Sequence, residues 1–276
     1  MQQSFKTIIV KLLKKIYRFP FILLTNYRIY ISDRPALKKK LLDKQADFFI
    51  KNNLDRDAGV HLINQTCMNL FNKEYSEDDG MFSEHLVMFS SISISSAFQV
   101  NKILEIGTFD GRTAAIFSNL FPNADITTID LEDDSDMFIE TYSRSQNYSD
   151  FNHDRDSLLS NFQNVVFKRL NSINLSEWDA DSFDLIWIDG AHGYPVIAMD
   201  IINSLRLISP GGVIMIDDVF TSNKENNQMY RSIGAYESLV SLKEAKSIDR
   251  FDLFLKRTGP KHNIKNSQKF VGFIYL

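Results

Sequence analysis

Short apolar runs alternate with longer amphipathic stretches from residue 102 to the end of the chain. The runs that are long enough to form strands cover residues 102–107, 125–130, 165–170, 183–189, 212–217, 251–255 and 270–276. Apolar positions with helical spacing lie between them, most clearly over 196–207. Continuous apolar strands that alternate with helices are typical of a mostly parallel sheet with both faces covered. The pattern therefore predicts a doubly wound α/β fold, in which the last two runs form an antiparallel hairpin around Gly259-Pro260.

Helical spacing dominates the first hundred residues. One face of a predicted helix is formed by Phe5, Ile8, Ile9, Leu12, Leu13 and Ile16. Residues 35–75 are polar and helical in pattern, with predicted breaks at 52–53 and 57–59. A turn signal at 78–80 then precedes another predicted helix over 83–97.

Charge divides the chain at a similar place. Residues 1–40 contain ten Lys or Arg against one acidic residue, a net charge of +9, whereas the whole chain carries −4. The remaining residues therefore carry −13. An acidic region of this kind argues against nucleic acid as the substrate, because it would repel a phosphate backbone. We predict a basic helical extension over residues 1–78 and a catalytic domain over residues 79–276.

The basic extension allows two interpretations. A basic amphipathic helix can lie in a membrane interface, which would make residues 1–40 a peripheral contact at the inner face of the membrane. It can equally pack on the catalytic domain or on a second subunit of a homo-oligomer. Lys11 interrupts the apolar stretch before it reaches signal-peptide length, and residues 19–24 are too few to span a bilayer. With Cys67 as the one cysteine, these features predict a cytoplasmic protein.

The first candidate binding segment follows the first predicted strand. In open α/β sheets the ligand lies outside the carboxyl ends of the strands. Gly107 and Gly111 permit a tight turn at this point, and the N-terminus of the following helix suits a carboxylate. The spacing differs from the G-x-G-x-x-G of dinucleotide sites. The spacing therefore counts against a nicotinamide dinucleotide as the bound ligand.

The next two strands end in further polar residues. Asp130 ends the second strand, where its carboxylate can accept hydrogen bonds from both hydroxyls of a ribose, or can instead cap a helix. Asn171 and Ser172 follow the third strand, where small polar groups can contact an adenine edge. The predicted cofactor-binding residues are Glu105, Gly107, Thr108, Gly111, Arg112, Asp130, Asn171 and Ser172.

Three aspartates follow the fourth and fifth strands. Parallel neighbours in the sheet would bring Asp189, Asp217 and Asp218 to one edge, where carboxylates without a basic partner repel one another. A hard divalent cation such as Mg²⁺ would resolve this repulsion, although two of the three could instead cap helices. His192, three residues after Asp189, is a candidate general base near neutral pH, or else a supporting group. We expect the other histidines, including His85, to be structural or solvent-facing.

These segments together resemble a known family. Residues 104–113 resemble motif I of class I S-adenosylmethionine-dependent methyltransferases. With the segments 189–192 and 211–218, the set resembles the macrocin O-methyltransferase and cephalosporin hydroxylase-like group, over about residues 80–220. The resemblance implies a seven-stranded sheet with the last strand antiparallel. It implies that S-adenosylmethionine is held by Gly107, Gly111 and Asp130, and that a metal is held by Asp189, Asp217 and Asp218.

The implied activity is Mg²⁺-assisted transfer of a methyl group from S-adenosylmethionine to a hydroxyl of a small molecule, sugar or glycan. The choice of acceptor comes from the resemblance, and the long connection over 131–163 could determine it. In this mechanism Asp189 and His192 are the predicted catalytic residues. Three alternatives stay open: a metal-independent methyltransferase with His192 as the base, a nicotinamide-dependent oxidoreductase, and a non-catalytic module on a membrane-associated assembly.

Overall fold

The computed structural model describes residues 35–77, 82–140, 148–179, 182–221, 232–258 and 269–276. The predicted helix near the N-terminus and the predicted turns at 78–80 and 259–260 lie outside these residues. Within the described part of the chain, no helix combines the length and the apolar character that are needed to cross a bilayer.

The described residues form a seven-stranded sheet with the order β3-β2-β1-β4-β5-β7-β6. The strands are β1 (Lys102–Ile106), β2 (Asp125–Asp130), β3 (Val165–Arg169), β4 (Phe183–Ile188), β5 (Ile208–Phe220), β6 (Arg250–Leu255) and β7 (Lys269–Tyr275). The five strands from β3 to β5 pair in parallel, whereas β7 pairs antiparallel with both β5 and β6. The predicted doubly wound sheet with an antiparallel C-terminal hairpin is confirmed.

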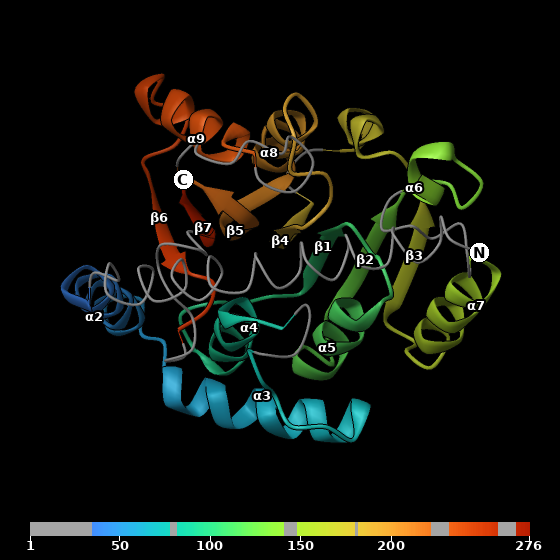
Figure 1. Ribbon diagram of the computed structural model, residues 1–276, viewed down its shortest axis with the longest axis horizontal. Helices are drawn as coiled ribbons and strands as arrows, with labels where there is room; N and C mark the ends of the chain where they lie inside the picture. The colour runs from blue at the N-terminus through green and yellow to red at the C-terminus, as the bar shows by residue number, and fades with distance from the viewer. Residues whose placement is uncertain (1–34, 78–81, 141–147, 180–181, 222–231, 259–268) are drawn as a thin grey trace, which may run out of the picture.

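Helices cover both faces of this sheet (Figure 1). They are α2 (Pro35–Lys51), α3 (Arg56–Phe71), α4 (Glu84–Ile94), α5 (Arg112–Leu120), α6 (Asp136–Glu140), α7 (Tyr148–Leu159), the 3₁₀ helix η2 (Ser172–Glu177), α8 (Val196–Leu207) and α9 (Gly234–Glu244). Figure 1 shows α3, α4 and α5 on one side of the sheet and α8 and α9 on the other. The central strands are therefore enclosed between two helical layers.

Successive residues of the central strands belong to two separate cores. Trp187 in β4 packs in the same hydrophobic cluster as residues of α3, α4 and α5. Its neighbours Ile186 and Ile188 pack in a second cluster with residues of α8 and α9. Because successive side chains of a strand point to opposite faces, a strand covered on both sides must be apolar at every position. This explains the continuous apolar runs in the sequence.

The N-terminal helices depart from the prediction at one point. The predicted break at 52–53 is confirmed, because α2 ends just before it. The break predicted at 57–59 is wrong, because these residues lie in the first turn of α3, with Asp55 as the N-cap. Gly59 is needed for helix packing instead, since a Cβ atom there would lie 2.1 Å from Oγ of Ser91 in α4.

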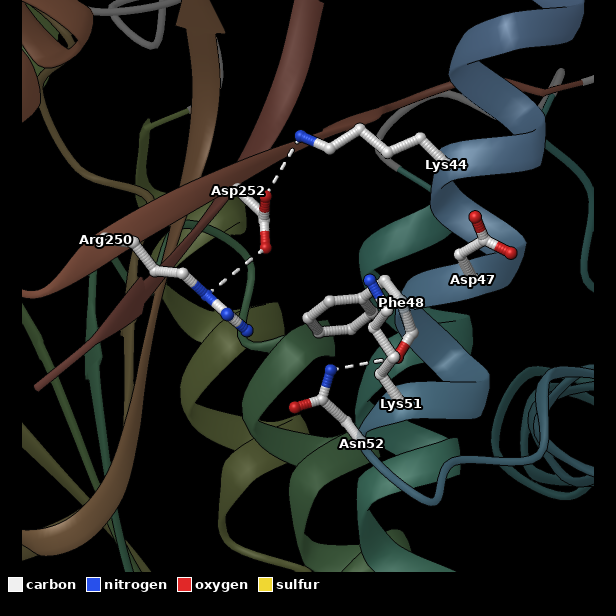
Figure 2. A pocket seen from close by; sticks show the side chains of 7 residues that line it. All are labelled: Lys44, Asp47, Phe48, Lys51, Asn52, Arg250 and Asp252. Carbon is white, nitrogen blue, oxygen red and sulfur yellow. Dashed lines mark hydrogen bonds and ion pairs between the residues drawn. The ribbon is translucent and has the colours of Figure 1, made fainter.

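The helices α2 and α3 share a core with the sheet. The ring of Phe48 in α2 has its centroid 4.3 Å from that of Phe254 in β6 and 5.0 Å from that of Phe273 in β7. A pocket lies where α2 meets the start of β6 (Figure 2), and Lys44 and Asp252 form an ion pair of 3.0 Å there. The domain boundary at 78/79 stays a prediction, but packing joins α2 and α3 to the sheet.

Candidate active site

The loop between β1 and α5 is folded tightly across the carboxyl ends of three strands. Gly107 has φ +104°, and a Cβ atom there would lie 2.3 Å from the carbonyl oxygen of Asp189 after β4. The backbone N–H groups of Gly107 and Thr108 both donate to the carbonyl oxygen of Ile129 in β2, at 2.9 and 3.2 Å. Gly111 has φ +79° and is the N-cap of α5. Glycine is therefore required at position 107 by both the backbone angle and the close approach.

Asp130 ends β2 beside this loop. One of its carboxylate oxygens accepts a hydrogen bond of 2.8 Å from the backbone N–H of Phe109, and the other accepts one of 2.9 Å from Leu131. The carboxylate therefore lies against the glycine-rich loop. Its predicted contact with a ribose stays a prediction.

Glu105 lies beneath the loop and is buried. Its Oε2 accepts a hydrogen bond of 2.6 Å from Thr128, whose hydroxyl also lies 2.6 Å from the hydroxyl of Thr108. Burial raises the pKa of Glu105 to about 8, and the bond from Thr128 opposes this shift. The structure therefore places this predicted binding residue as a support of the loop from below.

The remaining predicted cofactor residues contact other parts of the protein. The guanidinium of Arg112 forms an ion pair of 2.8 Å with Asp110. The side chain of Asn171 accepts a hydrogen bond of 3.1 Å from Ile173 and so caps η2. The carbonyl oxygen of Ser172 accepts a bond of 3.2 Å from Asn203. Contacts of Arg112, Asn171 and Ser172 with a cofactor stay predictions.

The three predicted acidic residues come together at the ends of β4 and β5. Ile188 pairs in parallel with Ile216, so Asp189 and Asp217 follow next to each other in register. Successive side chains of a strand normally point to opposite faces. The register between β5 and β7 shifts between Ile216 and Val219, which marks a bulge, and Asp218 has φ +50° there. The bulge therefore turns both carboxylates of the Asp217-Asp218 pair toward the same cationic group.

That cationic group corrects the expectation of an acidic cluster without a basic partner. Nζ of Lys256 lies 2.5 Å from Oδ2 of Asp217 and 2.6 Å from Oδ1 of Asp218. Nζ of Lys269 pairs with the other oxygen of Asp218. Lys256 directly follows β6 and Lys269 begins β7, so the antiparallel hairpin delivers both. Neither lysine is marked by a local spacing in the sequence, because the hairpin brings both to the aspartates from later in the chain.

The pKa values in this cluster follow from burial and neighbouring charge. Burial would raise the pKa of Asp217, but the Lys256 ammonium outweighs it and holds that pKa below its ordinary value. Burial raises the pKa of Asp189, and repulsion from Asp217 adds to the rise. Burial would lower the pKa of Lys256, but the adjacent carboxylates raise it above its ordinary value. Asp217 and Lys256 therefore form a buried ion pair.

Two histidines complete this end of the site. Nε2 of His192 lies 3.7 Å from Oδ1 of Asp189, and its Nδ1 has no hydrogen-bond partner among the described residues. Burial lowers the pKa of His192, which keeps the ring neutral. The ring of His85 in α4 stacks on that of Trp187, with 4.8 Å between the ring centroids. Burial lowers the pKa of His85 to about 3, and the charge of Asp217 opposes this shift. His85 is therefore structural, as expected, but it lies within the field of the acidic cluster.

Residues 104–219 match the model of a family that is described as a methyltransferase domain. This segment is therefore similar to a methyltransferase domain. The matched segment begins in β1, ends in β5, and includes the glycine-rich loop, Asp130 and the three aspartates. Lys256 and Lys269 lie beyond it. Comparison of the chain with curated proteins found no match.

Several solved structures resemble the fold of this chain at low identity. They include the MycE methyltransferase of the mycinamycin biosynthetic pathway, in complex with Mg and SAH (15% identity, 77% of this chain and 54% of that chain, TM-score 0.48). Another is the O-methyltransferase TomG from Streptomyces achromogenes (16% identity, 83% of this chain and 94% of that chain, TM-score 0.46). A third is an O-methyltransferase family protein from Burkholderia thailandensis (11% identity, 68% of this chain and 55% of that chain, TM-score 0.43). The chain spans about half the length of the first solved structures that it matches.

The donor set formed by the three aspartates does not fit Mg²⁺ as it is arranged. A magnesium ion needs oxygen ligands at about 2.1 Å in a nearly octahedral shell. Three of the four carboxylate oxygens of Asp217 and Asp218 are instead paired with lysine ammonium groups. In the ranges given above, no group of three or more His, Cys, Asp or Glu side chains is arranged to hold a metal. No catalytic step is therefore assigned to a metal here.

Proposed function

We propose that this chain transfers a methyl group from S-adenosylmethionine to a hydroxyl group of a small molecule. One observation carries the proposal. The glycine-rich loop after β1 and the carboxylate of Asp130 after β2 meet at the carboxyl edge of a sheet with the order β3-β2-β1-β4-β5-β7-β6, within the segment that matches a methyltransferase family. In open α/β sheets this edge is where ligands bind.

The donor would be bound by the loop and Asp130. The left-handed backbone at Gly107 and Gly111 permits a close approach of a ligand to the main chain, and the N-terminus of α5 suits a carboxylate such as that of methionine. Asp130 would accept hydrogen bonds from the ribose hydroxyls. These contacts would place the sulfonium near the acidic end of the site.

The acceptor hydroxyl would lose its proton to His192. This imidazole is buried and neutral, and its Nδ1 has no partner among the described residues. The acceptor oxygen then forms a bond to the methyl carbon, the carbon–sulfur bond breaks, and its electron pair stays on sulfur to give S-adenosylhomocysteine. Such an in-line displacement depends mainly on positioning. The proposal of a sugar or glycan as the acceptor rests on the motif resemblance.

Binding of S-adenosylhomocysteine to the full chain, measured by isothermal titration calorimetry, tests the donor site. We expect binding by the wild type and a loss of about tenfold or more in affinity in Asp130→Asn, which removes one charged hydrogen-bond acceptor. Asp125→Asn is the matched control, because Asp125 begins the same strand at the opposite edge of the sheet. Binding of NAD without binding of S-adenosylhomocysteine would refute the proposal and favour the oxidoreductase alternative.

Turnover tests the role of the base. A screen of sugars and nucleotide sugars with radiolabelled S-adenosylmethionine should identify an acceptor for the wild-type protein. His192→Gln should then reduce kcat by about 10²–10⁴-fold, as expected for loss of a general base, with unchanged affinity for S-adenosylhomocysteine. Turnover in His192→Gln equal to that of the wild type would exclude the imidazole as the base.

A further inference from the structure

We propose that Lys256 is the resident cation of this active site, and that its ammonium binds the acceptor oxygen in the place where the sequence predicted a divalent metal. The inference rests on the proposed methyl transfer and adds a catalytic residue to it. It starts from the geometry of one atom, since Nζ of Lys256 lies within 2.6 Å of carboxylate oxygens of both Asp217 and Asp218.

The ammonium has a hydrogen bond left to give. A lysine ammonium carries three N–H bonds. Among the described residues, two of them go to Asp217 and Asp218, so one can be donated to a substrate oxygen. Two neighbouring atoms can also accept a hydrogen bond. Oδ1 of Asp217 and Nδ1 of His192 are buried without hydrogen-bond partners in the described part of the chain. The proposal places the acceptor hydroxyl between this cation and this base.

The backbone of Lys256 is held from three sides. Its N–H donates to the carbonyl oxygen of Lys269 at 3.1 Å, and its own carbonyl oxygen accepts a bond of 2.9 Å from Glu84 at the start of α4. The preceding residue, Leu255, donates to the side chain of Gln45 in α2 at 3.1 Å. A charge that is fixed before the substrate arrives needs little reorganisation during reaction, which is the condition for strong electrostatic catalysis.

The side chain of Glu84 connects this support to the N-terminal helices. The carboxylate is fully buried, and Arg56 in α3 binds it at 2.6 and 2.8 Å while Gln45 donates to it at 3.0 Å. Helices α2 and α3 lie outside the segment that matches the methyltransferase family, yet they fix the residue that holds Lys256. The backbone position of Lys256 therefore depends also on residues outside that segment.

In the reaction, Lys256 keeps all of its protons. Its N–H donates to the acceptor oxygen, which loses its own proton to His192 and forms the bond to the methyl carbon as the carbon–sulfur bond breaks. The ammonium stabilises the negative charge that develops on the oxygen before the new bond is complete. In this proposal the single positive charge of Lys256 acts where the sequence predicted a divalent cation.

Metal binding tests the inference without a known acceptor. Titration of Mn²⁺ into the full chain by isothermal titration calorimetry should show weak binding or none in the wild type. Lys256→Met should bind Mn²⁺ at least roughly tenfold more tightly, because it removes a positive charge from between two carboxylates. Lys44→Met is the matched control, since Lys44 pairs with Asp252 at the other end of β6 (Figure 2) and should leave Mn²⁺ binding unchanged. Equal affinity in wild type and Lys256→Met, whether weak or tight, would overturn the inference.

Two further measurements keep the test decisive. If Lys256→Met does not fold, Lys256→Gln replaces it, and tight Mn²⁺ binding by the wild type would by itself refute the inference.

Calorimetry with S-adenosylhomocysteine on the same proteins separates the two proposals, because failure of the wild type to bind it contradicts the methyl transfer and leaves the Mn²⁺ result interpretable. With an acceptor in hand, wild-type turnover should survive EDTA, and Lys256→Met should lose kcat while it retains affinity for S-adenosylhomocysteine. Loss of wild-type turnover in EDTA would refute the role of Lys256.

Discussion

At the glycine-rich end of the site the backbone does the positioning, whereas at the acidic end charged side chains do. The loop at Gly107 is shaped by a positive φ angle and by contact with the backbone after β4. The acidic end depends on Lys256 and Lys269, which reach Asp217 and Asp218 from a hairpin later in the chain. One end is therefore determined by local conformation and the other by tertiary assembly.

The two ends also handle a buried carboxylate differently. Glu105 lies beneath the loop with a hydroxyl partner, so its pKa is raised to about 8. Asp217 lies against an ammonium, so its pKa is lowered. Substitutions at the acidic end should therefore change the free energy of unfolding by leaving a buried charge unpaired. Substitutions at the glycine-rich end should change it through steric collisions or through the protonation of Glu105.

The largest effect is expected where a buried ion pair is broken. Lys256→Met leaves Asp217 and part of Asp218 buried without a cation, which should lower the free energy of unfolding by about 3–5 kcal/mol in urea titrations. Lys269→Met should cost clearly less, because the side chain of Lys269 is 32% exposed and that of Lys256 only 6%. Equal costs would show that both lysines contribute alike and that the pair with Asp217 has no special weight.

A steric test addresses the glycine-rich end. Gly107→Ala should lower the free energy of unfolding by about 2–4 kcal/mol, because the new Cβ atom adds a collision with the carbonyl of Asp189 to the strain of a positive φ angle. Gly211→Ala is the matched control. Gly211 also has a positive φ, +80°, but no atom within 4 Å of its Cβ position, so about 1 kcal/mol is expected. If thermal and urea unfolding gave the same cost for both, the close approach at Gly107 would be unimportant.

The same contrast explains what the sequence could predict. The central strands were found because both of their faces are buried, which makes them apolar throughout. The loop after β1 lies beside Asp130 because β1 and β2 pair directly, and both follow from the predicted order of strands. The helices α6, α7 and α9 were not predicted. Helix α6 has only five residues, α7 is rich in polar residues, and α9 follows residues without a clear pattern.

Lys256 and Glu84 could not have been found from local pattern. A lysine after an apolar strand and a glutamate at the start of a helix are ordinary surface residues in most sequences. Both are buried here only because the hairpin, α3 and α4 pack together, and each then has an opposite charge within hydrogen-bonding distance. Long-range charge pairing leaves no spacing to recognise.

Glu105 gives the pH-dependent test. Its folded-state pKa, about 8, lies above the ordinary value of 4.5, so its contribution to stability is present below pH 4.5 and is lost as the pH rises toward 8. Glu105→Gln keeps the shape without the titration. The free energy of unfolding of Glu105→Gln should therefore gain about 2–3 kcal/mol relative to the wild type between about pH 5 and pH 7.5. Parallel pH profiles of the two proteins would show that Glu105 does not titrate in this range.

The smallest effect compares one arginine from the support of each end. Arg56→Met leaves the fully buried carboxylate of Glu84 without its cation and should cost about 1.5–3 kcal/mol in urea unfolding. Arg112→Met should cost less than about 1 kcal/mol, because its partner Asp110 is 29% exposed and water can replace the pair. The arginines themselves are equally exposed, at 35%, so exposure of the cation does not cause the difference between the two costs. A cost for Arg56→Met as small as that for Arg112→Met would mean that Glu84 does not depend on α3, and that Lys256 is held by β7 and α2 without help from that helix.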